Sequence, residues 1–242
     1  MDDDRFKGRF LGVLGGMGPM AGAAFMTRLI ALTPGECDQQ HVPVILWSDP
    51  RVPDRPAGHA GQGVDPLPWM QNGVNHLVQA GAQAIVIPCN TAHLWYEPLA
   101  AESGVPILHI VQAVIDDLRR QGVDRGHVGV MGTATTLKSG LYQRALEAQG
   151  YECITPAGVR LEQCCADSIH LVKTNCLDQA YAPAAEVVTE LRRRGADAVV
   201  LGCTELPLAI PHARRAGLGI AMTDSIDALA LAALEWYRHS EE

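Results

Sequence analysis

The sequence of 242 residues lacks the features that mark exported and membrane-spanning chains. Its first ten residues, MDDDRFKGRF, are charged and contain no apolar stretch, so we expect no signal peptide. No uninterrupted apolar run reaches the roughly 18 residues that a membrane span requires. The seven cysteines are an odd number with no disulfide framework in their spacing, which favours a reducing, cytoplasmic location.

Positive charge is also scarce. The chain has 19 Lys and Arg residues against 27 Asp and Glu residues, which gives a formal net charge of −8, and it has no basic run. This balance argues against nucleic acid and against an anionic membrane as partners. It does not exclude an anionic small molecule, because a cleft needs only a few local cations to bind one.

Short apolar segments alternate with longer helical ones along the chain. This alternation predicts an α/β fold with mainly parallel sheets. The length allows two domains, which we expect at residues 1–112 with 225–242 and at residues 113–224. Strands are expected near residues 10–14, 42–47, 85–88, 105–110, 128, 153, 198 and 220, helices over 19–32, 69–80, 111–120, from 141, through the 160s to 190s and from 226, and a surface loop over 49–68.

Two segments, 114 positions apart, repeat each other. Residues 81–93 read GAQAIVIPCNTAH and residues 195–207 read GADAVVLGCTELP, so a strand pattern ends each time at a cysteine, Cys89 or Cys203. The turns GVLGGMGP and GVMGTATT form a second, weaker pair. We therefore expect two halves related by pseudo-twofold symmetry. The active site should lie in the cleft between them, beyond the carboxyl ends of the strands.

A thiol between a strand and a helix has a specific chemical use. Unpaired N–H groups at a helix start stabilise anions, so we expect lowered pKa values for Cys89 and Cys203. Asn90, Thr91 and Thr204 follow these thiols and are candidate helix caps or anion donors. Two thiols on opposite faces of a ligand can remove a proton from one face of a carbon and return one to the other. The competing interpretation is an inert core position, which is usual for cysteine.

Four motifs resemble those of the aspartate racemases of the aspartate/glutamate racemase superfamily. They are GVLGGMGP, VPDR, PCNTAH and GCTEL, and the resemblance covers about residues 10–236. It implies two α/β domains, a homodimer, and a two-base racemisation of aspartate, of glutamate or of a broader set of amino acids, without a cofactor. Glutamate racemases carry Asp-Ser-Gly and Cys-Thr-His where this chain has Gly-Met-Gly and Cys-Thr-Glu, which favours the aspartate type.

The resemblance also implies the site residues. Cys89 and Cys203 would be the catalytic pair, and no metal would take part. Arg55 and Lys173 would be cations near the substrate, although the sequence without this resemblance favours a solvated surface charge for each. Glu205 either orients a neighbouring group or caps a helix. The full set of substrate-binding residues that the resemblance implies is Met17, Arg55, Asn90, Thr91, Thr133, Thr136, Lys173 and Thr204.

Three alternatives remain open. Superfamily relatives isomerise or decarboxylate small diacids through a single essential cysteine. The stretch GMGPMA at residues 16–21 fits a dinucleotide-binding fingerprint, although its first acidic candidate, Asp49, lies well beyond the expected spacing of about 20 residues. The third alternative is a metal-binding thiol module, whose spacing matches no zinc pattern. Its candidate ligands are Cys164, Cys165, His170 and Cys176.

Overall fold

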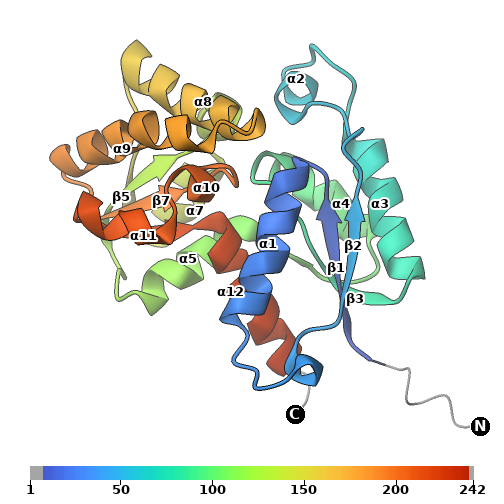
Figure 1. Cartoon of the computed structure of the whole chain (residues 1–242). Helices are drawn as coiled ribbons and strands as arrows, with labels where there is room; N and C mark the ends of the chain where they lie inside the picture. Colours follow the sequence, from blue (N-terminus) through green and yellow to red (C-terminus); the bar gives the residue numbers. More distant parts are fainter. Residues whose placement is uncertain (1–7, 240–242) are drawn as a thin grey trace, which may run out of the picture.

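Two four-stranded parallel sheets carry the two halves of the chain (Figure 1). The strand order is β2-β1-β3-β4 in one sheet and β6-β5-β7-β8 in the other, so β3 and β7 occupy equivalent places. This arrangement confirms the expected α/β fold with two similar sheets. The strands are β1 (Phe10–Gly15), β2 (Val44–Ser48), β3 (Ala82–Val86), β4 (Ile107–Leu108), β5 (Gly126–Met131), β6 (Tyr151–Ile154), β7 (Ala198–Leu201) and β8 (Ala221–Asp224).

The computed structural model describes residues 8–239. Residues 1–7 and 240–242 lie outside the described residues. The first group belongs to the N-terminal segment in which we expect no signal peptide, and the second belongs to the end of the expected first domain. The division into domains at residues 112 and 225 stays a prediction.

Helices α1 and α3 pack against the first sheet, and α9 packs against the second. Pro19 occupies the first turn of α1, where its missing N–H costs little. The α-helices are α1 (Pro19–Leu32), α2 (Arg55–His59), α3 (Leu67–Gln79), α4 (Tyr96–Glu102), α5 (Ile110–Arg120), α6 (Ala134–Lys138), α7 (Leu141–Glu147), α8 (Val159–Lys173), α9 (Leu177–Arg193), α10 (Leu206–Ala209), α11 (His212–Arg215) and α12 (Ser225–Arg238). Within residues 8–239, the 3₁₀ turns are η2 (Asp38–Gln40), η3 (Thr91–Trp95) and η4 (Ala216–Leu218).

Three of these helices are missing from the sequence-based expectation. Helix α2 lies inside the expected loop over 49–68, and α6 and α11 were not expected. Each has only four or five residues. A helix this short makes little more than one turn, so it shows no hydrophobic period that a sequence could reveal.

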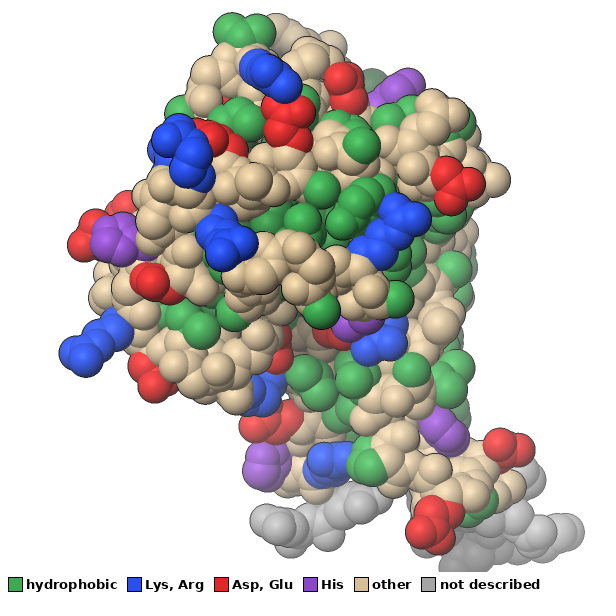
Figure 2. All heavy atoms as spheres, turned by 60° about the vertical axis from the view of Figure 1, so that its left-hand side comes forward, with side chains coloured by type: hydrophobic (Ala, Val, Ile, Leu, Met, Phe, Trp, Pro, Cys, Tyr) green, Lys and Arg blue, Asp and Glu red, His purple; other side chains and the backbone are tan. Residues whose placement is uncertain are grey.

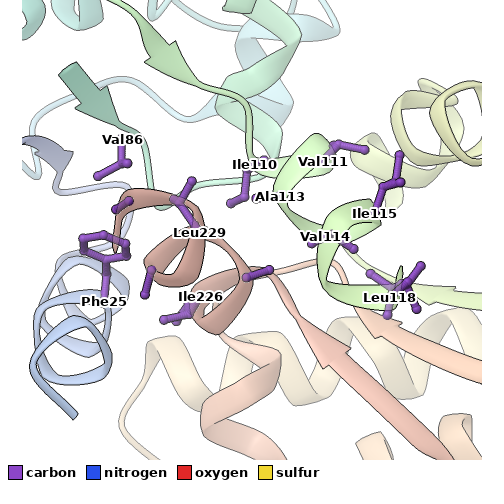
Figure 3. Packing of buried hydrophobic residues seen from close by; sticks show 14 of the residues in the cluster. Phe25, Val86, Ile110, Val111, Ala113, Val114, Ile115, Leu118, Ile226 and Leu229 are labelled. Atoms are coloured by element: carbon purple, nitrogen blue, oxygen red, sulfur yellow. The ribbon is translucent and has the colours of Figure 1, made fainter. Parts of the chain in front are cut away.

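The two halves share one apolar core through α5 and α12. Helix α12 packs against both α1 and α5. The core joins Phe25 of α1 and Val86 of β3 to Ile226 of α12 (Figure 3), and it continues to Val128 and Val200 of the second sheet. Full burial of one such side chain stabilises the fold by about 1.5–3 kcal/mol. The relative placement of the two sheets is therefore fixed by shared hydrophobic burial.

The surface mixes both signs of charge. On the face in Figure 2, Lys and Arg side chains are interspersed with Asp and Glu, and no broad basic patch forms there. Within residues 8–239, none of the helices has both the length and the apolar character needed to cross a bilayer.

Candidate active site

Two cysteines meet at one cleft between the sheets. Strand β3 ends at Val86 and β7 at Leu201, and from each the chain continues into a loop that carries Cys89 or Cys203. Both thiols line one small cavity, which we call the cleft. Of the residues assigned by resemblance, only Thr136 is absent from its lining. The lining residues are Met17, Arg55, Pro56, Cys89, Asn90, Thr91, Thr133, Lys173, Cys203, Thr204 and Glu205.

The expectation of lowered thiol pKa values is wrong. Burial raises the pKa of Cys89, which is 6% exposed, and outweighs the opposing charge of Arg55. Burial also raises the pKa of Cys203 well above its ordinary value, and the Glu205 carboxylate raises it further. The elements that follow the thiols, η3 and α10, have five and four residues. Such short elements build little of the dipole that the expectation required, so desolvation dominates.

Glu205 makes the two thiols chemically unequal. Its Oε2 accepts hydrogen bonds from Cys203 Sγ at 3.0 Å and from Thr204 Oγ1 at 3.3 Å. The residue is 5% exposed, and its side chain makes no hydrogen bond to the start of α10. The capping alternative for Glu205 is therefore wrong, and its carboxylate faces the thiol. Cys89 has the opposite kind of neighbour, because the Arg55 guanidinium favours its thiolate form.

Arg55 lines the cleft and keeps one guanidinium nitrogen without a hydrogen-bond partner among residues 8–239. Its Nη1 donates to the carbonyl oxygens of Val52 at 3.0 Å and Pro53 at 2.9 Å, which hold the side chain in place. Asp54 caps α2 by accepting from the Ala57 N–H at 2.9 Å. The buried Nε of Arg55 has no hydrogen-bond partner among residues 8–239. A buried N–H without an acceptor is costly, so this nitrogen suits an anionic ligand.

The second cation of the cleft is Lys173, at the end of α8. Its positive charge lowers the pKa of both Cys89 and Cys203, against the larger effect of burial. Arg55 and Lys173 come from different halves of the chain, so a ligand with two anionic groups could contact one cation from each half.

The glycine turn after β1 has a packing role. Gly16 has a φ of +93°, and a Cβ there would come within 2.3 Å of the Asp49 carbonyl oxygen. Only glycine fits this close approach of two backbones. Asp49 itself pairs with Arg51 at 2.8 Å. These contacts explain Gly16 without a dinucleotide, and Met17 is the residue of this turn that lines the cleft.

Three threonines link the two halves beside the thiols. Thr91 Oγ1 lies 3.2 Å from Thr133 Oγ1 and 2.9 Å from Thr136 Oγ1. Thr133 also caps α6 by accepting from the Thr136 N–H at 3.1 Å. Thr136 is fully buried and lies behind the cleft, which differs from its expected place at the substrate. Its hydroxyl therefore supports Thr91 and Thr133.

Asn90 is a bridge and not a helix cap. No side-chain cap forms at the start of η3. Instead, the Tyr142 hydroxyl donates to Asn90 Oδ1 at 2.5 Å, and Asn90 Nδ2 donates to Ser225 Oγ at 2.8 Å. The sequence carried no signal for Tyr142 or Ser225, because both lie far along the chain from the motif that contains Asn90.

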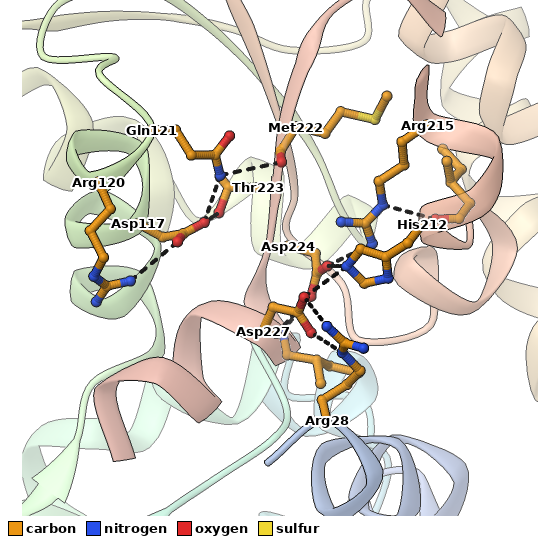
Figure 4. Close-up of polar contacts among 12 residues, drawn as sticks. Arg28, Asp117, Arg120, Gln121, His212, Arg215, Met222, Thr223, Asp224 and Asp227 are labelled. Carbon is orange, nitrogen blue, oxygen red and sulfur yellow. Dashed lines mark hydrogen bonds and ion pairs between the residues drawn. The ribbon is translucent and has the colours of Figure 1, made fainter. Parts of the chain in front are cut away.

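The cysteines of α8 do not form the imagined metal site. In the described part of the chain, the group close enough to share an ion is His212, Asp224 and Asp227. Figure 4 shows these acids already paired: Asp227 with Arg28 at 2.5 Å and Asp224 with Arg215 at 2.6 Å. Two carboxylates balanced by two guanidinium groups need no cation. The cluster is an ionic link between α1, α11 and α12.

Comparison with known proteins extends the motif resemblance to most of the chain. A family model described as Asp/Glu/Hydantoin racemase matches residues 14–233. The broad specificity amino-acid racemase RacX of Bacillus subtilis is 27% identical over 234 residues, which cover 94% of this chain and 97% of that protein. The glutamate racemase of Persephonella marina is 26% identical over 160 residues, or 65% of this chain and 59% of that protein.

A solved structure agrees over nearly the full length. Picrophilus torridus aspartate racemase superimposes with a TM-score of 0.85 and 30% sequence identity, covering 95% of this chain and 94% of that one. The similarity thus includes both sheets and the cleft between them.

Proposed function

Because the chain belongs to the Asp/Glu/hydantoin racemase family, whose match spans residues 14–233, we propose that it interconverts L- and D-aspartate by proton transfer between Cys89 and Cys203. Family membership confirms the resemblance and supports amino-acid racemase activity. The observation that carries the finer proposal is that both thiols, two cations and one carboxylate line the same small cavity. Such a pair needs no cofactor, since the chemistry requires only an acid and a base on opposite faces.

The charges of the cleft favour a dicarboxylate substrate. Its two cations, Arg55 and Lys173, match in number the two carboxylates that aspartate and glutamate each carry at neutral pH. One carboxylate would bind the Nε edge of Arg55, which lacks an acceptor, and the other would face Lys173.

The proton transfer balances within the thiol pair. In one direction the Cys89 thiolate takes the α-proton and becomes a thiol, while the Cys203 thiol protonates the opposite face and becomes a thiolate. The reverse direction exchanges the roles. Arg55 opposes the burial that raises the pKa of Cys89, whereas Glu205 adds to the rise in the pKa of Cys203, so Cys89 is the thiol that loses its proton more readily. The two cations and the exclusion of water would stabilise negative charge at the substrate carbon.

Isotope exchange tests this proposal directly. The protein is incubated with L-aspartate in D₂O without added cofactor, and the products are analysed by α-proton NMR and chiral chromatography. We expect deuterium at the α-carbon together with D-aspartate. Cys89→Ala and Cys203→Ala should each abolish racemisation, whereas Cys153→Ala, at a thiol outside the cleft, should not.

Two results would change the assignment. Racemisation by Cys89→Ala at the wild-type rate would contradict the two-thiol mechanism. If deuterium enters glutamate or neutral amino acids but not aspartate, the two-thiol mechanism stands and the proposed substrate is wrong. If no amino acid exchanges, the one-thiol isomerase or decarboxylase becomes the better assignment.

We also propose that the protein is a homodimer, as the sequence resemblance implies. We expect neither nucleic acid nor membrane as a partner, and we place the division between the domains at residues 112 and 225. Sedimentation equilibrium measures the assembly state, and a monomer at micromolar concentration would contradict it.

A further inference from the structure

Tyr142 touches the loops of both thiols. The residue is fully buried in α7, and its ring lies against Gly202, the residue before Cys203. A Cβ at Gly202 would come within 2.9 Å of Tyr142 Cε2 and 2.8 Å of the Met131 carbonyl oxygen. The loop that carries Gly202 and Cys203 therefore packs against the ring of Tyr142 at Gly202.

The hydroxyl of the same side chain reaches the other thiol loop. It donates to Oδ1 of Asn90, the residue after Cys89, at 2.5 Å. The amide of Asn90 is held from its other end by Ser225 Oγ at 2.8 Å, at the start of α12. All three polar side chains are buried, so water does not compete for these hydrogen bonds. Burial also raises the pKa of the Tyr142 hydroxyl, which keeps it a donor over the working pH range.

We propose that Tyr142 is a positioning residue that sets the separation of the Cys89 and Cys203 loops across the cleft. The ring of Tyr142 packs against the Cys203 loop at Gly202, and its hydroxyl holds the Cys89 loop through Asn90. In a two-base transfer both sulfur atoms must lie within reach of one carbon, so a small shift of either loop slows the reaction. This inference rests on the proposed racemase function and adds the residue that aligns its two thiols.

The protein offers a matched pair of variants. Tyr142→Phe removes only the hydroxyl that reaches Asn90. Tyr151→Phe removes the hydroxyl of another buried tyrosine in the same half, which donates to the Val123 carbonyl at 2.7 Å and does not line the cleft. Both variants lose one hydrogen bond, so thermal unfolding should change similarly in both.

We expect the two variants to differ in catalysis. Tyr142→Phe should lower kcat about 10- to 100-fold in both directions, because misplaced groups lose rate steeply. Its KM should stay within about twofold of wild type, since Arg55 and Lys173 are untouched. The primary isotope effect with α-deuterated aspartate should rise, because proton transfer becomes more rate-limiting. Tyr151→Phe should leave kcat, KM and the isotope effect unchanged.

A second measurement does not depend on racemase activity. Alkylation of Cys89 and Cys203 by iodoacetamide, read by peptide mass spectrometry, should be about fivefold faster in Tyr142→Phe, because both loops open more often. Tyr151→Phe should match wild type. If the wild-type protein racemises no amino acid, the proposed function fails, and this comparison still tests whether Tyr142 fixes the two loops.

The inference is overturned if Tyr142→Phe and Tyr151→Phe behave alike in both assays. Ser225→Ala serves as an additional variant, because it releases the other end of the Asn90 amide without touching the tyrosine ring. If Tyr142→Phe does not fold, Ser225→Ala takes its place in both assays. The proposal is then overturned if Ser225→Ala has the kcat and the alkylation rates of the wild-type protein.

Discussion

Replacement of Glu205 by glutamine should make the Cys203 thiol more acidic. Glutamine keeps the size of the side chain and can still accept a hydrogen bond from Sγ, but it removes a negative charge at 3.0 Å. Coulomb's law at that separation gives about 1.4 kcal/mol in a water-like medium and about 5.5 kcal/mol at an effective dielectric constant of 20. These energies correspond to a fall in the Cys203 pKa of about one to four units.

The assay is the pH dependence of Cys203 alkylation by iodoacetamide. Because only the thiolate reacts, the pH midpoint of the alkylation rate reports the pKa of the thiol. Glu205→Gln should move that midpoint downward by at least about one unit, and Cys89, which Glu205 also influences, should move less. Racemisation in the direction that uses Cys203 as the base should become faster, because a larger fraction of this thiol is then ionised near neutral pH.

Glu162→Gln is the matched control, because Glu162 belongs to the same half of the chain but is exposed and does not line the cleft. It should leave both midpoints in place. If Glu205→Gln leaves the Cys203 midpoint unchanged or raises it, the carboxylate does not control this thiol and the inequality of the two cysteines is refuted.

Two further predictions concern Arg55 and His93. Arg55→Lys removes the Nε that lacks a partner, and should raise KM for aspartate about 10- to 150-fold through the loss of a charge-assisted hydrogen bond. Arg51→Lys, a control in the same loop but outside the cleft, should leave steady-state kinetics unchanged. Equal KM values for the two variants would contradict the role of Arg55. His93 is buried between the Cys89 carbonyl and the Ile110 N–H, and burial lowers its pKa to about 3, below the value of about 6.5 in an unfolded chain. The stability that neutral His93 provides is present above pH 6.5 and is lost as pH falls towards 3, so thermal unfolding of His93→Gln should depend less on pH in this window; the same acid dependence as wild type would contradict this reasoning.

Much of the fold could be predicted because its signals are local. The boundaries of α1 follow from Pro19 and the apolar period of residues 19–32, and both agree with the structure. The short helices α2 and α6 left no such signal. The motif resemblance predicted that Arg55 lies beside the cleft. Only the folded loop shows that its Nε is buried without a hydrogen-bond partner among the described residues.

The sequence by itself determined that two equivalent strands end in cysteines. Repeated segments fold alike, and parallel strands in equivalent places end at equivalent edges, so the repeat placed Cys89 and Cys203 at equivalent edges of the two sheets. The shared core of α5 and α12 then turned these edges towards one cleft. Tertiary structure alone decided how these thiols behave, since burial and the neighbouring charges of Arg55 and Glu205 set their pKa values. It also decided that Tyr142 joins the two loops. Desolvation and contact between distant segments depend on how the whole chain packs, and no local pattern encodes them.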